Sequence, residues 1–242
     1  PRQSLVKEAD LLVAIGGDGT MLYANRLAAG AGLPLLGINR GRLGFLADIG
    51  TDEMLDRVSE VLAGQYGEEH RMMLQAELDD GDQLLRCMAL NDVVLQRRET
   101  GRMLDFETWI DGVYVNTHGG DGLVVATPTG STAYALSGGG PILHPGTGAI
   151  AVVPICPHTL SDRPLVVGAD AEIEVRLVED ADSTSEVICD GRVLGELLAG
   201  HRLRITRAPC AAILIHPLDH DYYRILRSKL HWGRGNRGQG GL

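Results

Sequence analysis

The N-terminal part of the chain alternates between short apolar runs and amphipathic stretches. Residues 11–15 (LLVAI) form a continuous apolar run that ends in glycines, which predicts a buried parallel strand. A helix is predicted over 21–29, and residues 34–38 (PLLGI) predict a second buried strand. Residues 51–63 predict an amphipathic helix with Thr51 as its N-cap. A strand, a glycine loop, a helix and a second strand in this order indicate a βαβ unit.

From about residue 70 the pattern changes to a succession of strand-length segments. Asp111-Gly112 and Asp190-Gly191 separate such segments, and an Asp-Gly pair is typical of a hairpin turn. The pattern therefore predicts a β-rich domain after a small α/β domain. The strands expected are 71–79, 84–95, 104–110, 113–117, 122–126, 150–156, 171–178, 185–189, 202–207 and 211–215.

These patterns predict where the domains begin and end. We expect an α/β domain over 1–67 and a β-rich domain over 68–220. A last helix is predicted over 221–232, packing back on the α/β domain, and the glycine-rich basic tail 233–242 is predicted to be disordered.

Composition and charge exclude several classes of protein. The 242 residues are 44% hydrophobic and 22% charged, as in ordinary globular domains. A formal net charge of −10 argues against a nucleic-acid partner and against an anionic membrane surface. No apolar run reaches the roughly 18–20 residues of a membrane-spanning helix.

The spacing of the cysteines and histidines predicts neither a metal site nor a disulfide framework. No two cysteines form a CxxC pair, so we expect buried free thiols in a reducing compartment and a cytoplasmic protein. We also expect no protein-held metal among the histidines. The four cysteines are Cys87, Cys156, Cys189 and Cys210.

The first motif suited to catalysis or ligand binding is Gly16-Gly17-Asp18-Gly19-Thr20, between the first strand and the first helix. Glycines at such a junction let backbone N–H groups and the helix N-terminus face an anion. A carboxylate inside a phosphate loop is unfavourable unless it binds Mg²⁺ or accepts a proton from an attacking hydroxyl. The alternative is an Asp-Gly turn in which Asp18 caps the helix.

Two further segments contain groups suited to a polar ligand. Residues 120–122 (GDG) and 127–134 (TPTGSTAY) combine glycines with small hydroxyl residues, and Tyr134 is able to stack on a ring. The alternative for this segment is a turn followed by a capped helix. Asn91-Asp92 is suited to a carboxamide or to paired ribose hydroxyls, or else marks a simple turn. Arg40, Arg42 and Arg102 are candidates to neutralise phosphate, or else solvated surface residues.

Taken together, these segments resemble the bacterial NAD kinase family over nearly the whole chain and in the same order. GGDG alone is shared with lipid kinases and phosphofructokinases, whereas GGDG with an Asn-acid pair and TPTGSTAY is specific. The matching segments are GGDGTML (16–22), INRGRLGFL (38–46), NDVVL (91–95), DGLVVATPTGSTAYALSGGGPI (121–142), PHTLSDRPLV (157–166) and HPLDHDYYRILRSKLHW (216–232).

The resemblance implies transfer of the γ-phosphate of ATP to the adenosine ribose 2′-hydroxyl of NAD, giving NADP. It implies an N-terminal α/β domain and a C-terminal β-sandwich-like domain that binds NAD. It also implies a homo-oligomer, either a dimer or a tetramer. Mg²⁺ or another divalent cation is expected to arrive with the nucleotide.

The resemblance also assigns roles residue by residue. Asp18 corresponds to the general base. Asn91 and Asp92 correspond to the pair that holds ribose hydroxyls, and Asp121 to the acid at the nicotinamide end. Phe45 corresponds to a residue beside the adenine. The phosphate-facing glycines are Gly16, Gly17 and Gly19, and the full NAD-binding set is Asp18, Gly19, Phe45, Asn91, Asp92, Arg102, Asp121, Thr129, Thr132, Ala133, Tyr134 and Ser137.

The chain departs from the family pattern at several places, including the Asn-acid pair and the N-terminal end. The pair reads Asn-Asp where Asn-Glu is common, and the shorter acid reaches less far. Relatives carry an additional strand–helix segment before the GGDGT strand. Only about a dozen residues precede that strand here, so we expect an incomplete α/β domain. The alternatives are another GGDG kinase acting on a lipid or sugar, and a non-catalytic NAD/NADP-binding sensor. A dehydrogenase is disfavoured because no GxGxxG with a following acid is present.

Overall fold

The computed structural model divides the chain into two compact units. The first comprises residues 1–70 and 212–242, and the second comprises residues 71–211. Residues 212–220 therefore group with the first unit, whereas the sequence pattern placed them with the β-rich domain. The structure describes residue 6 and residues 8–41, 44–79, 81–98, 103–159, 161–178 and 185–232.

Some sequence predictions lie outside the described residues. These are Arg42, Arg102 and the tail 233–242. Within the described part of the chain, no helix has both the length and the apolar character needed to cross a membrane.

The first unit contains the predicted βαβ arrangement. Strands β1 (Leu12–Gly16) and β2 (Leu35–Asn39) pair in parallel, joined through helix α2 (Asp18–Ala28). Helix α2 begins earlier than the apolar pattern indicated. Asp18 suits this position, because an acidic side chain in the first turn complements the positive end of the helix.

The two parallel strands differ in burial. Every residue of β2 is buried, as predicted. In β1 the side chains of Val13 and Ile15 are 39% and 51% exposed, so the prediction of a buried strand is wrong there. The physical reason is that β1 is an edge strand, which pairs only with β2 among the described strands.

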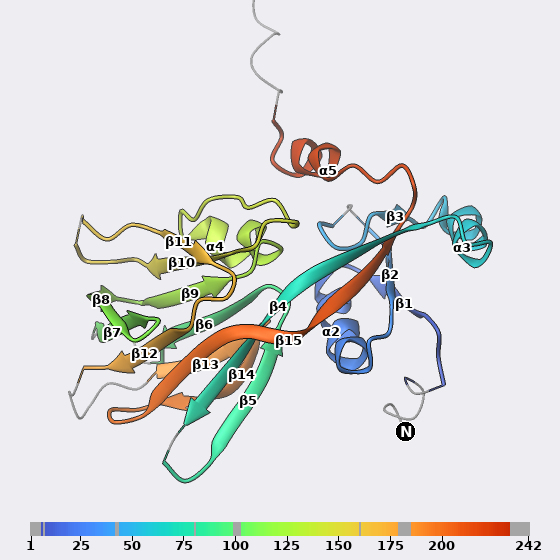
Figure 1. Ribbon diagram of the computed structural model, residues 1–242. Helices are drawn as coiled ribbons and strands as arrows, with labels where there is room; N and C mark the ends of the chain where they lie inside the picture. The colour runs from blue at the N-terminus through green and yellow to red at the C-terminus, as the bar shows by residue number, and fades with distance from the viewer. Residues whose placement is uncertain are drawn as a thin grey trace, which may run out of the picture. The chain divides into compact units, whose positions relative to one another are not determined.

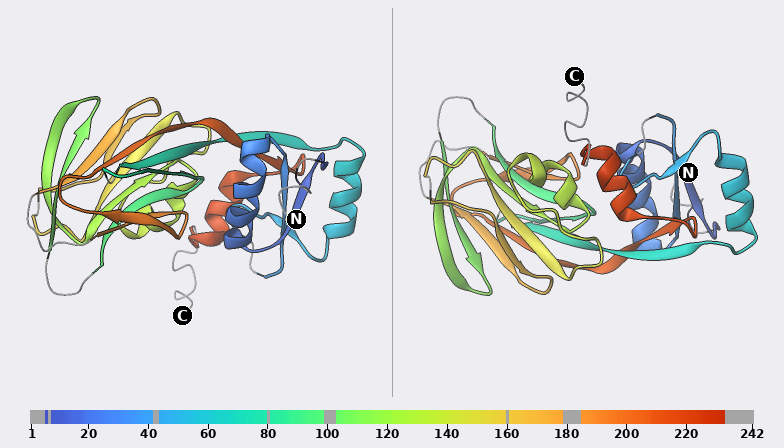
Figure 2. Two further views of the ribbon diagram at one scale, coloured as in Figure 1. Left: turned by 90° about the horizontal axis from the view of Figure 1, so that it is seen from below. Right: turned by 90° about the horizontal axis from the view of Figure 1, so that it is seen from above.

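Helices lie on both faces of strand β2. Leu36 and Ile38 pack on α3 (Met54–Leu62) through Val61, and Gly37 faces α2. A Cβ at Gly37 would lie 2.8 Å from the Met21 sulfur, so the glycine admits the close approach of α2. Figure 2 shows α2 and α3 on opposite sides of the strands. The other elements here are a 3-10 turn (Ala29–Ala31), β3 (Ile49–Gly50) and α5 (Tyr222–Lys229).

Helix α3 differs from its prediction at the N-terminus. Its N-cap residue is Glu53 rather than Thr51, and the helix starts at Met54. Glu53 instead accepts hydrogen bonds from the Gly50 amide and the Arg57 guanidinium. These contacts fix the turn between β3 and α3.

The second unit is built from strands of two sheets, as expected for a β-rich domain. One sheet has the order β1-β2-β15-β12-β7-β8, with β3, β4 and β5 joined beside that path, and the other has the order β11-β10-β9-β6-β13-β14. The strands are β4 (Gly67–Asp79), β5 (Leu84–Ala89), β6 (Asp92–Arg97), β7 (Leu104–Ile110), β8 (Val113–Gly120), β9 (Gly122–Ala126), β10 (Ala149–Ile155), β11 (Leu165–Gly168), β12 (Ile173–Leu177), β13 (Ser185–Cys189), β14 (Arg192–Leu197) and β15 (Arg202–His216), with a 3-10 turn (Gly130–Thr132) and helix α4 (Tyr134–Ser137).

The core of the second unit lies between its two sheets (Figure 1). Leu74 and Phe106 from one sheet meet Val93, Val125 and Val187 from the other, and all five are almost fully buried. Alternation along each strand supplies these inward-facing residues. The predicted sandwich-like architecture is confirmed.

Both Asp-Gly pairs form the hairpin turns that the sequence predicts. Asp111 and Asp190 adopt positive φ values of 51° and 46°, each followed by a glycine at 75°. Two successive residues in the left-handed region match the right-handed twist of the flanking strands. The turns connect β7 to β8 and β13 to β14.

The cysteines differ from expectation. Cys87 on β5 and Cys189 at the end of β13 form a disulfide across 102 positions of sequence, and Cys156 is exposed rather than buried. The expectation of four buried free thiols is therefore wrong. Linear spacing carries no information about this pair, because the sandwich brings β5 and β13 together only after folding.

Candidate active site

The first part of the candidate site is the GGDGT loop. Strand β1 ends at Gly16, Gly17 is the N-cap, and Asp18 is the first residue of α2. The N-cap interpretation of Asp18 is wrong, because Gly17 holds that position without any side-chain cap. The carboxylate of Asp18 thus remains available for contacts outside its own helix.

Asp18 is fixed by the backbone of a distant loop. Its Oδ2 accepts a hydrogen bond from the Phe45 amide at 2.9 Å, and its Oδ1 accepts one from the Leu46 amide at 3.0 Å. The side chain is half-buried, so it retains access to solvent. Each oxygen has a further lone pair. Phe45, which the resemblance assigns to a place beside the adenine, therefore also contacts Asp18 through its amide.

Gly44 is a site residue that sequence analysis did not single out. A Cβ at this position would lie 1.9 Å from the Asp18 Oδ1 atom. Glycine thus leaves the space that the carboxylate occupies. The only sequence signal was its place in the Leu-Gly-Phe segment, which does not reveal what the glycine faces.

The three loop glycines have different roles. A Cβ at Gly16 would lie 2.2 Å from the Thr20 hydroxyl, so this glycine permits the tight entry into α2. Gly17 and Gly19 are exposed, and a Cβ at either would meet no atom within 4 Å. The N-terminus of α2 is therefore open, and it has the partial positive charge that attracts phosphate.

In the second unit, the Asn91-Asp92 pair meets the hydroxyl-rich segment. The Thr127 hydroxyl donates to the Leu90 carbonyl at 2.6 Å, and the Thr127 amide donates to the Asn91 carbonyl at 2.9 Å. A Cβ at Gly130 would lie 2.0 Å from that same Asn91 oxygen. Glycine is required at this position because the close neighbour is backbone, which is unable to move aside.

Asp190 organises the same place from the β13–β14 turn. Its carboxylate accepts hydrogen bonds from the Leu90 amide at 2.8 Å and the Asn91 amide at 2.8 Å. Burial first, and the negative charge of Asp190 second, raise the pKa of Asp92 to about 7. Sequence analysis recorded Asp190 only as part of a turn, because nothing near it in sequence reveals these amides.

The remaining residues that the resemblance assigns to the nucleotide differ in accessibility. Thr129 is buried, and its hydroxyl accepts a hydrogen bond from Arg71 at 3.3 Å. Arg71 was also missed, because a charged residue inside a strand gives no distinctive pattern. Thr132 and Ala133 are half-buried, whereas Tyr134 and Ser137 on α4 are exposed.

Asp121 lies apart from the Asn91-Asp92 pair. Asp92 stands opposite Ala126 and Gln96 stands opposite Gly122 in the β6–β9 ladder, which places Asp121 at the other end of that ladder. Four residues of strand correspond to roughly 13 Å. Asp121 instead pairs with Arg97 at 3.0 Å. Within one chain, these acids therefore do not contact the same ribose.

A glycine loop at an open helix N-terminus beside a fixed carboxylate, on an α/β unit followed by a β-sandwich unit, is typical of a phosphotransferase. Residues 2–66 match the model of the ATP-NAD kinase N-terminal domain, and residues 90–217 match that of the ATP-NAD kinase C-terminal domain. The chain belongs to the ATP-NAD kinase family.

Individual relatives agree with this assignment. The NAD kinase of Hydrogenovibrio crunogenus is 46% identical over 234 residues, covering 96% of this chain and 80% of that protein. The NAD kinase of Aromatoleum aromaticum is 50% identical over 226 residues, covering 93% of this chain and 75% of that protein. The resemblance and the enzyme class predicted from the motifs are confirmed.

Solved structures show the same fold. Yeast NADH kinase complexed with NADH superposes with a TM-score of 0.91 at 30% identity, over 99% of this chain and 71% of that one. An NAD kinase from Archaeoglobus fulgidus in complex with ATP gives a TM-score of 0.78 at 27% identity, over 96% and 86% of the two chains.

Proposed function

We propose that the protein transfers the γ-phosphate of ATP to the adenosine ribose 2′-hydroxyl of NAD, with Asp18 as the general base. One observation carries the assignment of the base. The Asp18 carboxylate is held by two amide hydrogen bonds beside an open helix N-terminus, inside the family's GGDGT motif. A proton acceptor and a phosphate-attracting dipole are thereby next to each other.

The proposed step uses this arrangement directly. The 2′-hydroxyl oxygen attacks the γ-phosphorus of ATP, its proton passes to Asp18, and the bond to the β,γ-bridging oxygen breaks to release ADP. Such a base contributes about 10²–10⁴-fold to the rate. Mg²⁺ carried by the nucleotide supplies neutralisation of the phosphate charge. Gly17 and Gly19 leave room for the phosphates at the start of α2.

The other residues are proposed to bind NAD rather than to react. Asn91 and Asp92 hold ribose hydroxyls, and Thr132, Ala133, Tyr134 and Ser137 contact the nucleotide. Thr129 is buried against Arg71, so we assign it to positioning the loop. Asp121 stands at the far end of β9 and serves a different part of the dinucleotide from Asp92.

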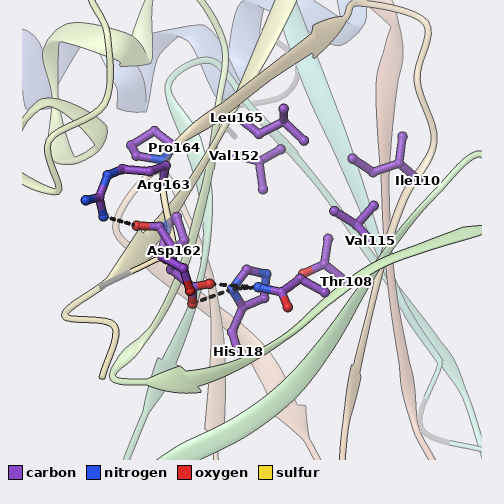
Figure 3. Close-up of a pocket in the computed structure, with 12 residues that line it drawn as sticks. Thr108, Ile110, Val115, His118, Val152, Asp162, Arg163, Pro164 and Leu165 are labelled. Carbon is purple, nitrogen blue, oxygen red and sulfur yellow. Dashed lines mark hydrogen bonds and ion pairs between the residues drawn. The ribbon is translucent and has the colours of Figure 1, made fainter. Parts of the chain in front are cut away.

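We also propose that the protein works as a homo-oligomer, with β8 and β11 in the interface. These strands are the last ones in their respective sheets. Val113 on β8 is 66% exposed, and Leu165 on β11 is 41% exposed. Between the two sheets lies a cavity of about 330 Å³, lined on one side by apolar side chains and on the other by the His118–Asp162 pair (Figure 3). Apolar edge strands of this kind are typical of association surfaces.

The catalytic assignment is tested with Asp18→Asn. We expect kcat for NADP formation from NAD, ATP and Mg²⁺ to fall at least 100-fold, while the Kd for NAD by calorimetry changes little. Asp56→Asn is the matched control, because Asp56 is an exposed acid on α3 of the same unit. Loss of NAD binding in step with activity would make Asp18 a binding residue instead.

The same assay tests the substrate assignment. Polyphosphate replaces ATP in a parallel reaction, and diacylglycerol or glucose replaces NAD. We expect product from NAD with ATP. A preference for the lipid or the sugar would overturn the proposed acceptor.

A further inference from the structure

A cluster of metal-ligand side chains lies where β15 leads into α5 (Figure 1). The Asp48 Oδ2 atom is 3.1 Å from the Nδ1 atom of His216 and 2.6 Å from that of His220. The two imidazole rings stack with centroids 3.9 Å apart. One ligand atom from each of the three residues lies within 4.8 Å of the others.

The donor set suits a transition metal. Two imidazole nitrogens and one carboxylate oxygen are the ligands of many zinc sites, which keep a fourth position for water. The His216 side chain is 5% exposed, whereas that of His220 is 17% exposed, so one side of the cluster reaches solvent.

The surroundings of His216 provide the second observation. Its Nε2 atom lies 3.3 Å from the Glu69 Oε2 atom, while its Nδ1 atom faces Asp48. A neutral imidazole has one N–H, so a ring that faces two carboxylates needs a second positive partner at Nδ1, either a proton or a metal cation. A carboxylate on the other ring nitrogen is the usual outer partner of a metal-bound histidine.

We propose that Asp48, His216 and His220 bind one transition-metal ion of the Zn²⁺ class, with Glu69 orienting His216. The ligands are Asp48 Oδ2 and the two Nδ1 atoms. This site is separate from the Mg²⁺ that accompanies ATP. Sequence analysis expected no metal site, although His216 and His220 are four residues apart, a spacing that was the available signal.

The location of the site gives it a positioning role. Asp48 is three residues from Phe45, whose amide holds Asp18. His220 precedes α5, and Lys229 of that helix lies 6.0 Å from the Phe45 ring centroid. A metal at this site therefore joins the loop that holds Asp18 to the start of α5.

The experiment measures metal binding rather than phosphorylation. The full chain is stripped with a chelator and titrated with Zn²⁺ by calorimetry and with Co²⁺ by visible absorption. We expect one equivalent per chain and the intense bands of four-coordinate Co²⁺. Glu69→Gln lowers the Zn²⁺ affinity about 10- to 100-fold, and His220→Asn lowers it further.

Two variants separate ligand loss from misfolding. His70→Asn is the control, because the His70 side chain is 62% exposed on β4. We expect the His70→Asn protein to keep the wild-type Zn²⁺ affinity. His220→Cys restores a ligand, so it binds Co²⁺ with an added thiolate charge-transfer band. All variants are compared for unfolding midpoint in metal-free buffer. Binding that is absent in the wild type, or unchanged in His220→Asn, overturns the proposal whether or not the protein phosphorylates NAD.

Discussion

At the scale of single residues, Gly44 and Asp18 show how an absent side chain determines where a carboxylate points. The space next to the Gly44 Cα is filled by the Asp18 Oδ1 atom. The two residues lie far apart in sequence, on either side of β2. The motif therefore predicted Asp18 as the reactive acid, but it could not predict which groups hold that acid in place.

The first residue-scale prediction concerns Gly44→Ala. The new methyl group displaces the Asp18 carboxylate, which is the mobile end of a side chain, so the free energy of unfolding changes by about 1 kcal/mol or less. A displacement of about 1 Å is able to cost on the order of 100-fold in rate. We expect kcat to fall at least tenfold, measured as NADP formation.

The matched control for that variant is Gly30→Ala. A Cβ at Gly30 meets no atom within 4 Å, and its φ is not positive. This variant keeps wild-type kcat. A Gly44→Ala protein with unchanged kcat would show that the observed position of Asp18 is not needed for turnover.

At the scale of elements, the largest error of the sequence pattern was a strand expected over 84–95. It is two strands, β5 and β6, separated at Leu90 and Asn91. Their amides bond to the Asp190 carboxylate instead of to a neighbouring strand. Local hydrophobicity is continuous through the break, so only the tertiary partner reveals it.

Other elements were predictable for a physical reason. Strand β7 and both Asp-Gly hairpins follow from period-two alternation and turn chemistry, which are local properties. Strands β11 and β14 were missed. Both contain apolar residues (LVVG and RVLGEL), but they are short and include a glycine, a residue that is uncommon in strands.

The contact between β6 and the β13–β14 turn predicts a pH dependence. Burial and then Asp190 raise the pKa of Asp92 to about 7 in the folded protein, against about 3.9 in an unfolded chain. The folded state keeps a proton that the unfolded state has lost between these values. The free energy of unfolding therefore falls as pH rises from about 4 to about 7.

Asp92→Asn removes this contribution, because the amide does not titrate. Urea unfolding across that pH range should show the variant gaining stability relative to the wild type as pH rises, by a total on the order of 4 kcal/mol. Asp170→Asn, whose aspartate side chain is 91% exposed, serves as the control and runs parallel to the wild type. A constant difference between wild type and Asp92→Asn would contradict the shifted pKa.

At the scale of the whole molecule, the proposed oligomer makes its own prediction. Leu165→Lys places a charge on the exposed edge strand β11, and we expect it to lower the mass measured by light scattering at equal concentration. Leu55→Lys is the control, because Leu55 is 74% exposed on α3. An unchanged mass for Leu165→Lys would place the interface elsewhere.

The long strand β15 has a consequence for the order in which the chain folds. Its residues Leu214 and Ile215 pair with β2 only after the whole of residues 71–211 has been made. During synthesis, the strands of the second unit are therefore all made before β15 is able to pair with β2. The sheet that carries the GGDGT loop is thus completed by the last strand of the described chain.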